Sequence, residues 1–212
     1  MPSVSDPRVV ALLKDGKVGV IPTDTIYGLA AVAANTAAVD RIYQLKRREH
    51  KPGTFLAATA RQLLALGLEA EALQAVTHLW PNPVSVVVPT HKGWERLDLG
   101  KHSLAVRIPK EDTLQELLEA TGPLATSSAN LFSQPPANTV EEAIAYFGDS
   151  VDFYVEGGDL SGRPPSTVIK FVDGRLEVLR QGAVTIDEKT GRLIDDIRRV
   201  PKDSTPDADS SP

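Results

Sequence analysis

Two threonines, an aspartate and a glycine follow the first apolar run of the sequence, in the segment PTDTIYGL at residues 22–29. Threonine hydroxyls both donate and accept hydrogen bonds, and Gly28 lets a ligand approach the backbone closely because it has no Cβ. These groups suit the binding of a small polar ligand. Thr23 and Asp24 also fit an ordinary turn or helix cap, so this segment alone does not define a site.

Three cations lie close together at Lys46, Arg48 and Lys51, immediately before Pro52. Arginine and lysine clamps are the usual means by which proteins hold the phosphates of a nucleotide. The same charges also suit the solvated C-terminal end of a helix, where cations complement the helix dipole. The cluster therefore predicts phosphate binding only in combination with the other segments.

Two further segments place polar side chains on apolar strands. In SLAVRI (103–108) the alternation puts Ser103 and Arg107 on one face. A buried arginine needs an anion, which is either the carboxylate of a substrate or a structural aspartate. TSSAN (126–130) gathers small hydrogen-bonding groups at the end of a strand, where α/β sheets commonly bind ligands. Each of the four segments is weak evidence alone, but together they are specific.

Strand and helix patterns alternate along the chain without an internal repeat, which predicts an α/β fold in packed layers. Apolar periodicity and capping signals predict helices at 6–15, around 39–43, within 60–79, at 111–121 and at 139–147. The predicted strands are 18–22, 55–59, 84–89, 103–108 and 123–127. Lys46 falls seven residues after Val39, which places it at the end of the apolar face of the second helix.

A β-hairpin is predicted over residues 168–180, with Asp173 and Gly174 as its turn. Folding the chain about that turn places Thr167 opposite Arg180 and leaves Ser166 beside that pair. The hairpin thus brings a hydroxyl and a guanidinium group to one end of the sheet.

The bulk properties of the chain exclude several classes of protein. Its 212 residues contain no cysteine, which excludes disulfides and thiolate metal sites. The sequence has no apolar run long enough to cross a membrane and no signal peptide, so we expect a cytoplasmic protein. A net charge of -5 disfavours nucleic-acid binding by bulk electrostatics. We expect residues 1–200 to form one domain and residues 201–212 a disordered acidic tail.

The set of segments resembles the YrdC-like family, the threonylcarbamoyl-AMP synthases. The matching elements, in the family's order over roughly residues 8–186, are PTDTIYGL, the Lys-x-Arg basic segment, SLAVRIP, SSAN, PSTV (165–168) and LRQG (179–182). The resemblance implies a single domain with a twisted mixed sheet, helices in layers on it, and an open concave cavity. It also implies a nucleotidyltransferase that makes threonylcarbamoyl-AMP and pyrophosphate from L-threonine, bicarbonate and ATP, as the first step of tRNA threonylcarbamoyladenosine modification.

The resemblance assigns residues to two ends of the cavity. The threonine end is implied to contain Thr25, Arg107, Thr126 and Ser166, with Arg107 binding the threonine carboxylate bidentately. The ATP end is implied to contain Lys46, Arg48, Lys51, Ser103, Ser128, Asn130, Pro136 and Arg180, with Lys46 and Arg48 stabilising the phosphates. Two features depart from the family pattern: the basic segment is one residue shorter, and Leu56 stands where many relatives have a histidine.

The resemblance also implies cofactors and partners. Mg²⁺ is expected to arrive with ATP, and no dedicated protein metal site is expected because the four histidines lack metal-binding spacing. The expected partner is a transferase complex that passes the threonylcarbamoyl group to tRNA, with tRNA itself as a candidate contact. The alternatives are a non-catalytic module for double-stranded or structured RNA and a different enzyme on the same fold. Salt-sensitive RNA binding without ATP turnover would distinguish the first alternative.

Overall fold

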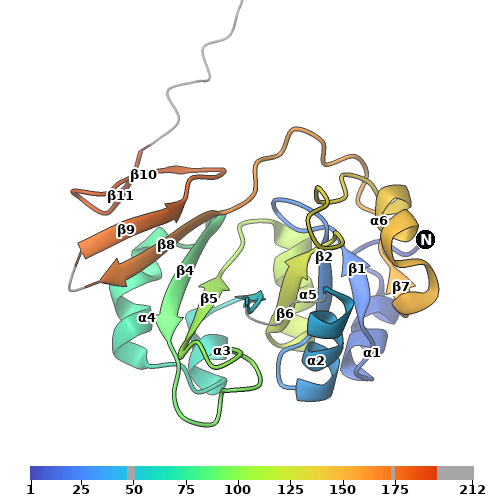
Figure 1. Ribbon diagram of the computed structural model, residues 1–212, viewed down its shortest axis with the longest axis horizontal. Helices are drawn as coiled ribbons and strands as arrows, with labels where there is room; N and C mark the ends of the chain where they lie inside the picture. The colour runs from blue at the N-terminus through green and yellow to red at the C-terminus, as the bar shows by residue number, and fades with distance from the viewer. Residues whose placement is uncertain (47–50, 173–174, 195–212) are drawn as a thin grey trace, which may run out of the picture.

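The computed structural model of the protein describes residues 1–46, 51–172 and 175–194. The strands of its main sheet are β1 (Gly19–Ile21), β2 (Gly28–Val32), β3 (Thr54–Leu56), β4 (Val84–Pro89), β5 (Ser103–Arg107), β6 (Leu124–Ser128), β7 (Phe153–Tyr154), β8 (Thr167–Val172) and β9 (Arg175–Arg180). In these described ranges they form one nine-stranded sheet in the order β7-β1-β2-β6-β3-β5-β4-β8-β9 (Figure 1). A separate pair joins β10 (Thr185–Asp187) to β11 (Arg192–Ile194).

The main sheet is mixed, as the sequence predicts. The pairs β1–β7, β3–β5 and β4–β8 are parallel, and the other neighbours are antiparallel. Strand β6 lies between β2 and β3, so Thr126 stands opposite Ala30 on one side and Thr54 on the other. This register brings the end of β6 beside the start of β2 and beside the start of β3.

Helices cover both faces of the sheet (Figure 1). They are α1 (Pro7–Lys14), α2 (Thr36–Leu45), α3 (Ala60–Ala65), α4 (Ala70–Val76), α5 (Asp112–Thr121) and α6 (Val140–Phe147), with 3₁₀ turns at Thr77–Leu79 and Gly148–Ser150. Helices α1 and α5 pack into one apolar cluster, whereas α2, α3, α4 and α6 pack into a larger second cluster. Strand β2 separates the two, because Ala30 belongs to the first cluster and Leu29 to the second. No helix in the described ranges is long and apolar enough to span a bilayer.

The helices predicted at 6–15, 111–121 and 139–147 are found with shifts of one residue at their ends, the helix expected around 39–43 extends from Thr36 to Leu45, and β4 coincides with its prediction. The Thr139 side chain caps α6 by accepting from the Glu142 N–H at 3.3 Å. The Glu142 carboxylate accepts from the Asn138 N–H at 2.7 Å, one residue earlier than in a standard capping box. Strands β2, β7, β10 and β11 were not predicted from the sequence. Strand β2 is the instructive case, because its sequence GLAAV has only one β-branched residue.

The predicted register of the β8–β9 hairpin is correct from Val172–Arg175 to Ile169–Val178 and is wrong by one residue only at its open end. Val168, and not Thr167, stands opposite Arg180, because the pairing shifts between Val168 and Ile169. Ile169 pairs with Val178, so Leu179 is the extra residue of a β-bulge. The predicted meeting of Ser166 with Arg180 nevertheless occurs, because the Nη2 of Arg180 donates to the Ser166 carbonyl at 2.8 Å. The turn at residues 173–174 and the tail at 201–212 lie outside the described residues.

Gly182 follows β9 at a place where two backbones touch. A Cβ built on Gly182 would lie 2.2 Å from the carbonyl oxygen of Pro165. We therefore expect Gly182→Ala to displace the chain before β8 and to lower the free energy of unfolding by about 1–3 kcal/mol, the usual cost of overpacking. Urea denaturation measures this loss, with Lys189→Ala in a nearby exposed turn as the control. Equal midpoints for the two variants would contradict the close contact.

Candidate active site

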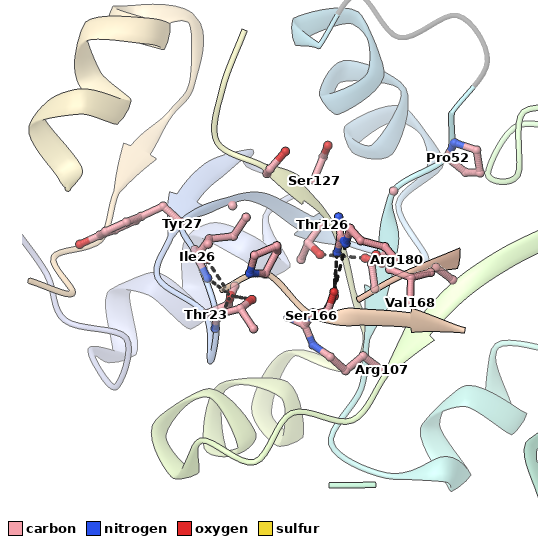
Figure 2. A pocket seen from close by; sticks show the side chains of 17 residues that line it. Thr23, Ile26, Tyr27, Pro52, Arg107, Thr126, Ser127, Ser166, Val168 and Arg180 are labelled. Carbon is pink, nitrogen blue, oxygen red and sulfur yellow. Dashed lines mark hydrogen bonds between the residues drawn. The ribbon is translucent and has the colours of Figure 1, made fainter. Parts of the chain in front are cut away.

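A cavity of about 240 Å³ lies where six parts of the chain meet (Figure 2). They are the connection from β1 to β2, the start of β3, strand β5, the end of β6, the start of β8 and the end of β9. The described lining residues are Thr23, Thr25, Ile26, Tyr27, Gly28, Pro52, Gly53, Thr54, Ala105, Arg107, Thr126, Ser127, Ser128, Pro165, Ser166, Val168 and Arg180. This lining is rich in hydroxyls and carries two arginines and no carboxylate, so it suits an anionic ligand.

Arg107 has an internal partner. Its Nη2 donates to the Asp24 Oδ1 at 2.8 Å, and each side chain is only 6% exposed. Burial raises the pKa of the Asp24 carboxyl, and the charge of Arg107 opposes that shift. Of the two anions that the sequence allowed for Arg107, the fold supplies the structural aspartate as a partner for Nη2, and the Arg107 side chain also lines the cavity. The Nε of Arg107 and the Oδ2 of Asp24 have no hydrogen-bond partner among the described residues.

The turn between β1 and β2 is held by its own side chains. Thr23 Oγ1 donates to the Ile26 carbonyl at 2.7 Å, so Thr23 has the turn-forming role that the sequence left open. Its Oγ1 also lies 3.1 Å from that of Thr25, which faces the cavity. The buried Tyr27 hydroxyl accepts from the Gly157 N–H and donates to the Gly158 carbonyl, both at 2.9 Å. These contacts fix the wall that carries Thr25.

Ser166 and Arg180 form the opposite wall. Arg180 donates to the Ser166 carbonyl from Nε at 3.1 Å and from Nη2 at 2.8 Å, and Nη2 also lies 3.1 Å from the Ser166 Oγ (Figure 2). The side chain of Ser85 on β4 lies behind them, with its Oγ 3.0 Å from that of Ser166. The Nη1 of Arg107 lies 3.5 Å from the Ser85 Oγ, so the two serines stand between the two arginines of the cavity.

Lys46 ends α2 under the loop that follows β6. Its ammonium donates to the Ser128 carbonyl at 2.8 Å and to the Asn130 carbonyl and Oδ1, each at 2.5 Å. Ser128 Oγ also donates to the Asn130 Oδ1 at 2.6 Å. Lys46 is only 3% exposed, so its prominent role in this structure is to hold the loop. From the sequence, the Lys46 ammonium was expected to face phosphate directly.

Some of the site residues predicted from the sequence lie together around the cavity, and others do not. Those that line the cavity are Thr25, Arg107, Thr126, Ser128, Ser166 and Arg180. Lys46 and Asn130 adjoin it through the loop, whereas Lys51, Ser103 and Pro136 are not among its described lining residues. Ser103 shares a strand face with Arg107 but lies about 13 Å further along β5, given the rise of a strand. Arg48 lies outside the described residues.

Several lining residues were not singled out from the sequence. Tyr27 stands inside PTDTIYGL and Ser127 inside TSSAN, so the motifs contained them without showing which way they point. Gly53 follows the basic segment, and a Cβ there would lie 2.2 Å from the Thr126 carbonyl oxygen. A glycine at the start of a strand can indicate that another backbone segment approaches it closely, so the sequence contained a signal for Gly53.

Comparison with known proteins places this geometry in a family. A family model named for Sua5, YciO and YrdC, with the description telomere recombination, matches residues 11–182. The chain belongs to the Sua5/YciO/YrdC family. Threonylcarbamoyl-AMP synthase of Klebsiella pneumoniae is 36% identical over 190 residues, which cover 86% of this chain and 98% of the relative. The corresponding synthase of Marinobacter nauticus is 35% identical over 170 residues, covering 76% and 87%.

Solved structures of the family agree with the fold. The Pyrococcus abyssi Sua5 structure complexed with L-threonine has a TM-score of 0.76 and 28% identity, and covers 85% of this chain. This chain spans only 54% of that Sua5 chain. Escherichia coli YciO has a TM-score of 0.71 at 24% identity, which is evidence for the fold alone. The mixed sheet with flanking helices is thus the architecture of the Sua5/YciO/YrdC family.

Proposed function

We propose that the protein is a threonylcarbamoyl-AMP synthase, an enzyme that joins L-threonine, bicarbonate and the adenylyl group of ATP. The observation that carries the proposal is the hydroxyl-lined cavity that Arg107 and Arg180 both line, with Arg180 bonded to Ser166 and Arg107 to Ser85 behind it. Arginines on both sides suit a reaction between a carboxylate-bearing amino acid and a polyphosphate. The names of the bacterial relatives and the threonine complex of the archaeal one support the same substrates.

The size of the cavity fits one part of this reaction. Its volume of about 240 Å³ is just below the range of about 300–1,000 Å³ for sites that enclose a drug-sized ligand. We infer that threonine and its carbamate occupy the enclosed part, beside Arg107, Thr25 and Thr126. The nucleotide extends past Arg180 toward the loop of Ser128, which Lys46 holds in place.

The reaction has two bond-forming steps. The threonine amine nitrogen forms a bond to the carbon of bicarbonate, water leaves, and a carbamate results. A carbamate oxygen then bonds to the α-phosphorus of ATP, while the bond from the α-phosphorus to the bridging oxygen breaks and pyrophosphate leaves. Arg107 holds the carboxylate and Arg180 faces the phosphates, so the protein contributes chiefly position and charge stabilisation.

The lining of the cavity fits a metal ion that ATP brings with it. No carboxylate stands among the described lining residues, and the described ranges contain no cluster of three His, Asp or Glu side chains. Phosphate oxygens and water are the ligands that Mg²⁺ commonly keeps in nucleotide sites, and the hydroxyls of Thr25 and Ser128 would add oxygen donors. The ion would neutralise charge on the phosphates.

The chemistry of the proposed product indicates which kind of enzyme uses it next. A mixed carbamoyl–phosphate anhydride is an activated acyl donor, so we propose that a tRNA-modifying transferase consumes it. The RNA-binding module that the sequence left open has less support, because the relatives carry the name of a synthase. We therefore propose that the transferase, and not this protein, makes the contact with tRNA.

Pyrophosphate release tests the proposal. Purified protein with ATP and Mg²⁺ is assayed with L-threonine and bicarbonate both present, or with either one omitted. We expect release only with the complete mixture. Release of inorganic phosphate and ADP in its place would indicate phosphoryl transfer, and RNA binding without any turnover would favour the binding module.

A further inference from the structure

A serine behind the cavity joins residues of its two walls. Ser85 lies on β4, is fully buried, and is not among the described lining residues. Its Oγ is 3.0 Å from the Ser166 Oγ and 3.5 Å from the Nη1 of Arg107. Ser166 in turn accepts from Arg180. A row of hydrogen bonds therefore runs from Arg107 through both serines to Arg180.

The direction of these hydrogen bonds follows from what each group can do. A guanidinium group only donates, so Ser85 accepts from Arg107 and Ser166 accepts from Arg180. The Ser85 hydroxyl hydrogen is buried, and the Ser166 oxygen is the acceptor that the described residues provide for it. Leaving that hydrogen unpaired would cost free energy in a site without solvent. Ser85 must therefore donate to Ser166.

This direction decides what Ser166 offers to a ligand. Its oxygen accepts from Ser85 and Arg180, so both lone-pair positions of its hydroxyl are occupied. The remaining group is its own hydrogen, and Ser166 lines the cavity. A hydroxyl held in this way donates into the cavity and favours an anionic acceptor over a donor such as an ammonium group.

We propose that Ser85 is a positioning residue for the threonine site, an inference that rests on the proposed function. It orients the Ser166 hydroxyl as a donor, so that Ser166 presents its O–H group to the threonine carboxylate beside the N–H groups of Arg107. Ser85 itself touches no substrate. Its effect therefore depends on Ser166, which separates it from a buried residue that only supports the fold.

Ser85→Ala tests this role. The variant is expected to raise the KM for L-threonine by about 3- to 10-fold, the loss that corresponds to one neutral hydrogen bond. The KM for ATP and kcat should change by less than about twofold. Thr121→Val is the matched control, because the Thr121 hydroxyl is also buried and donates within α5, away from the cavity. That control should lose stability without a change in either KM.

A double-mutant cycle tests whether Ser85 acts through Ser166. If it does, Ser85→Ala adds less than about twofold to the threonine KM of Ser166→Ala. Multiplied effects would overturn the inference, as would a Ser85→Ala variant with an unchanged threonine KM or with equal rises for both substrates. Calorimetric titration of threonine, with folding checked by circular dichroism, gives the same comparison without turnover. A wild-type protein that forms no threonylcarbamoyl-AMP would instead refute the proposed function.

Discussion

Replacing Arg107 with lysine is expected to raise the KM for L-threonine about 10- to 100-fold while the KM for ATP changes by less than about threefold. A hydrogen bond to a charged group contributes about 1.5–3 kcal/mol, and lysine cannot reproduce the guanidinium fork. Lysine keeps the positive charge that Asp24 needs in its buried position, so the variant should fold. Steady-state kinetics with each substrate varied in turn measure the effect. Equal increases for both substrates would show that Arg107 does not bind the threonine end.

The buried ion pair allows binding to be separated from stability. Arg107→Ala leaves Asp24 as an uncompensated buried charge and should lower the free energy of unfolding by about 3–5 kcal/mol. Removing both charges in Asp24→Asn with Arg107→Gln should recover much of that loss, because a buried pair is costly to desolvate. Threonine binding should remain impaired in the double variant. Restored threonine binding without the guanidinium would contradict the assignment.

Replacing Lys46 with methionine is expected to lower kcat/KM for ATP by about 100-fold or more. Methionine has nearly the same length, but the Ser128 and Asn130 carbonyl oxygens lose their charged donor. The loop after β6 then loses the contact that sets its position, and misplaced binding groups are costly for catalysis. Pyrophosphate release at varied ATP concentrations measures the loss. Lys51→Met serves as the comparison, with a smaller effect expected.

A second variant identifies how Lys46 acts. Asn130→Ala removes the side-chain oxygen that accepts from both Lys46 and Ser128. If Lys46 acts by holding this loop, Lys46→Met with Asn130→Ala should lose little more activity than Lys46→Met alone. Multiplied losses in the double variant would mean that the ammonium contacts phosphate directly, as the sequence analysis expected.

The sequence allowed the elements around the site to be predicted where local patterns were strong. Strand β4 follows from its run of valines, and the meeting of Ser166 with Arg180 follows from the hairpin. The bulge at Leu179 could not be predicted, because nothing in the local sequence marks where the pairing of β8 with β9 shifts. Strand β2 was missed because alanine and glycine carry little strand preference.

The sequence indicated which residues lie in the site more readily than which groups their side chains contact. The sequence showed that Arg107 needs an anion, but only tertiary structure brings Asp24 within 2.8 Å across 83 positions of the chain. Likewise, the apolar face of α2 placed Lys46 near the site, yet the choice between phosphate and loop carbonyls depended on the path of residues 128–130. The contacts of Ser85 could not be predicted, because a single serine among valines is typical of an ordinary strand.

The mass of the reaction product shows whether the protein joins threonine, bicarbonate and the adenylyl group of ATP in one molecule. Protein, ATP and Mg²⁺ are incubated with L-threonine and with bicarbonate that carries a heavy carbon isotope, and the nucleotide products are analysed by mass spectrometry. We expect threonylcarbamoyl-AMP one mass unit heavier than the product from ordinary bicarbonate, together with pyrophosphate. An unlabelled adenylate of threonine, or no adenylate from folded protein that binds ATP and threonine, would contradict this expectation.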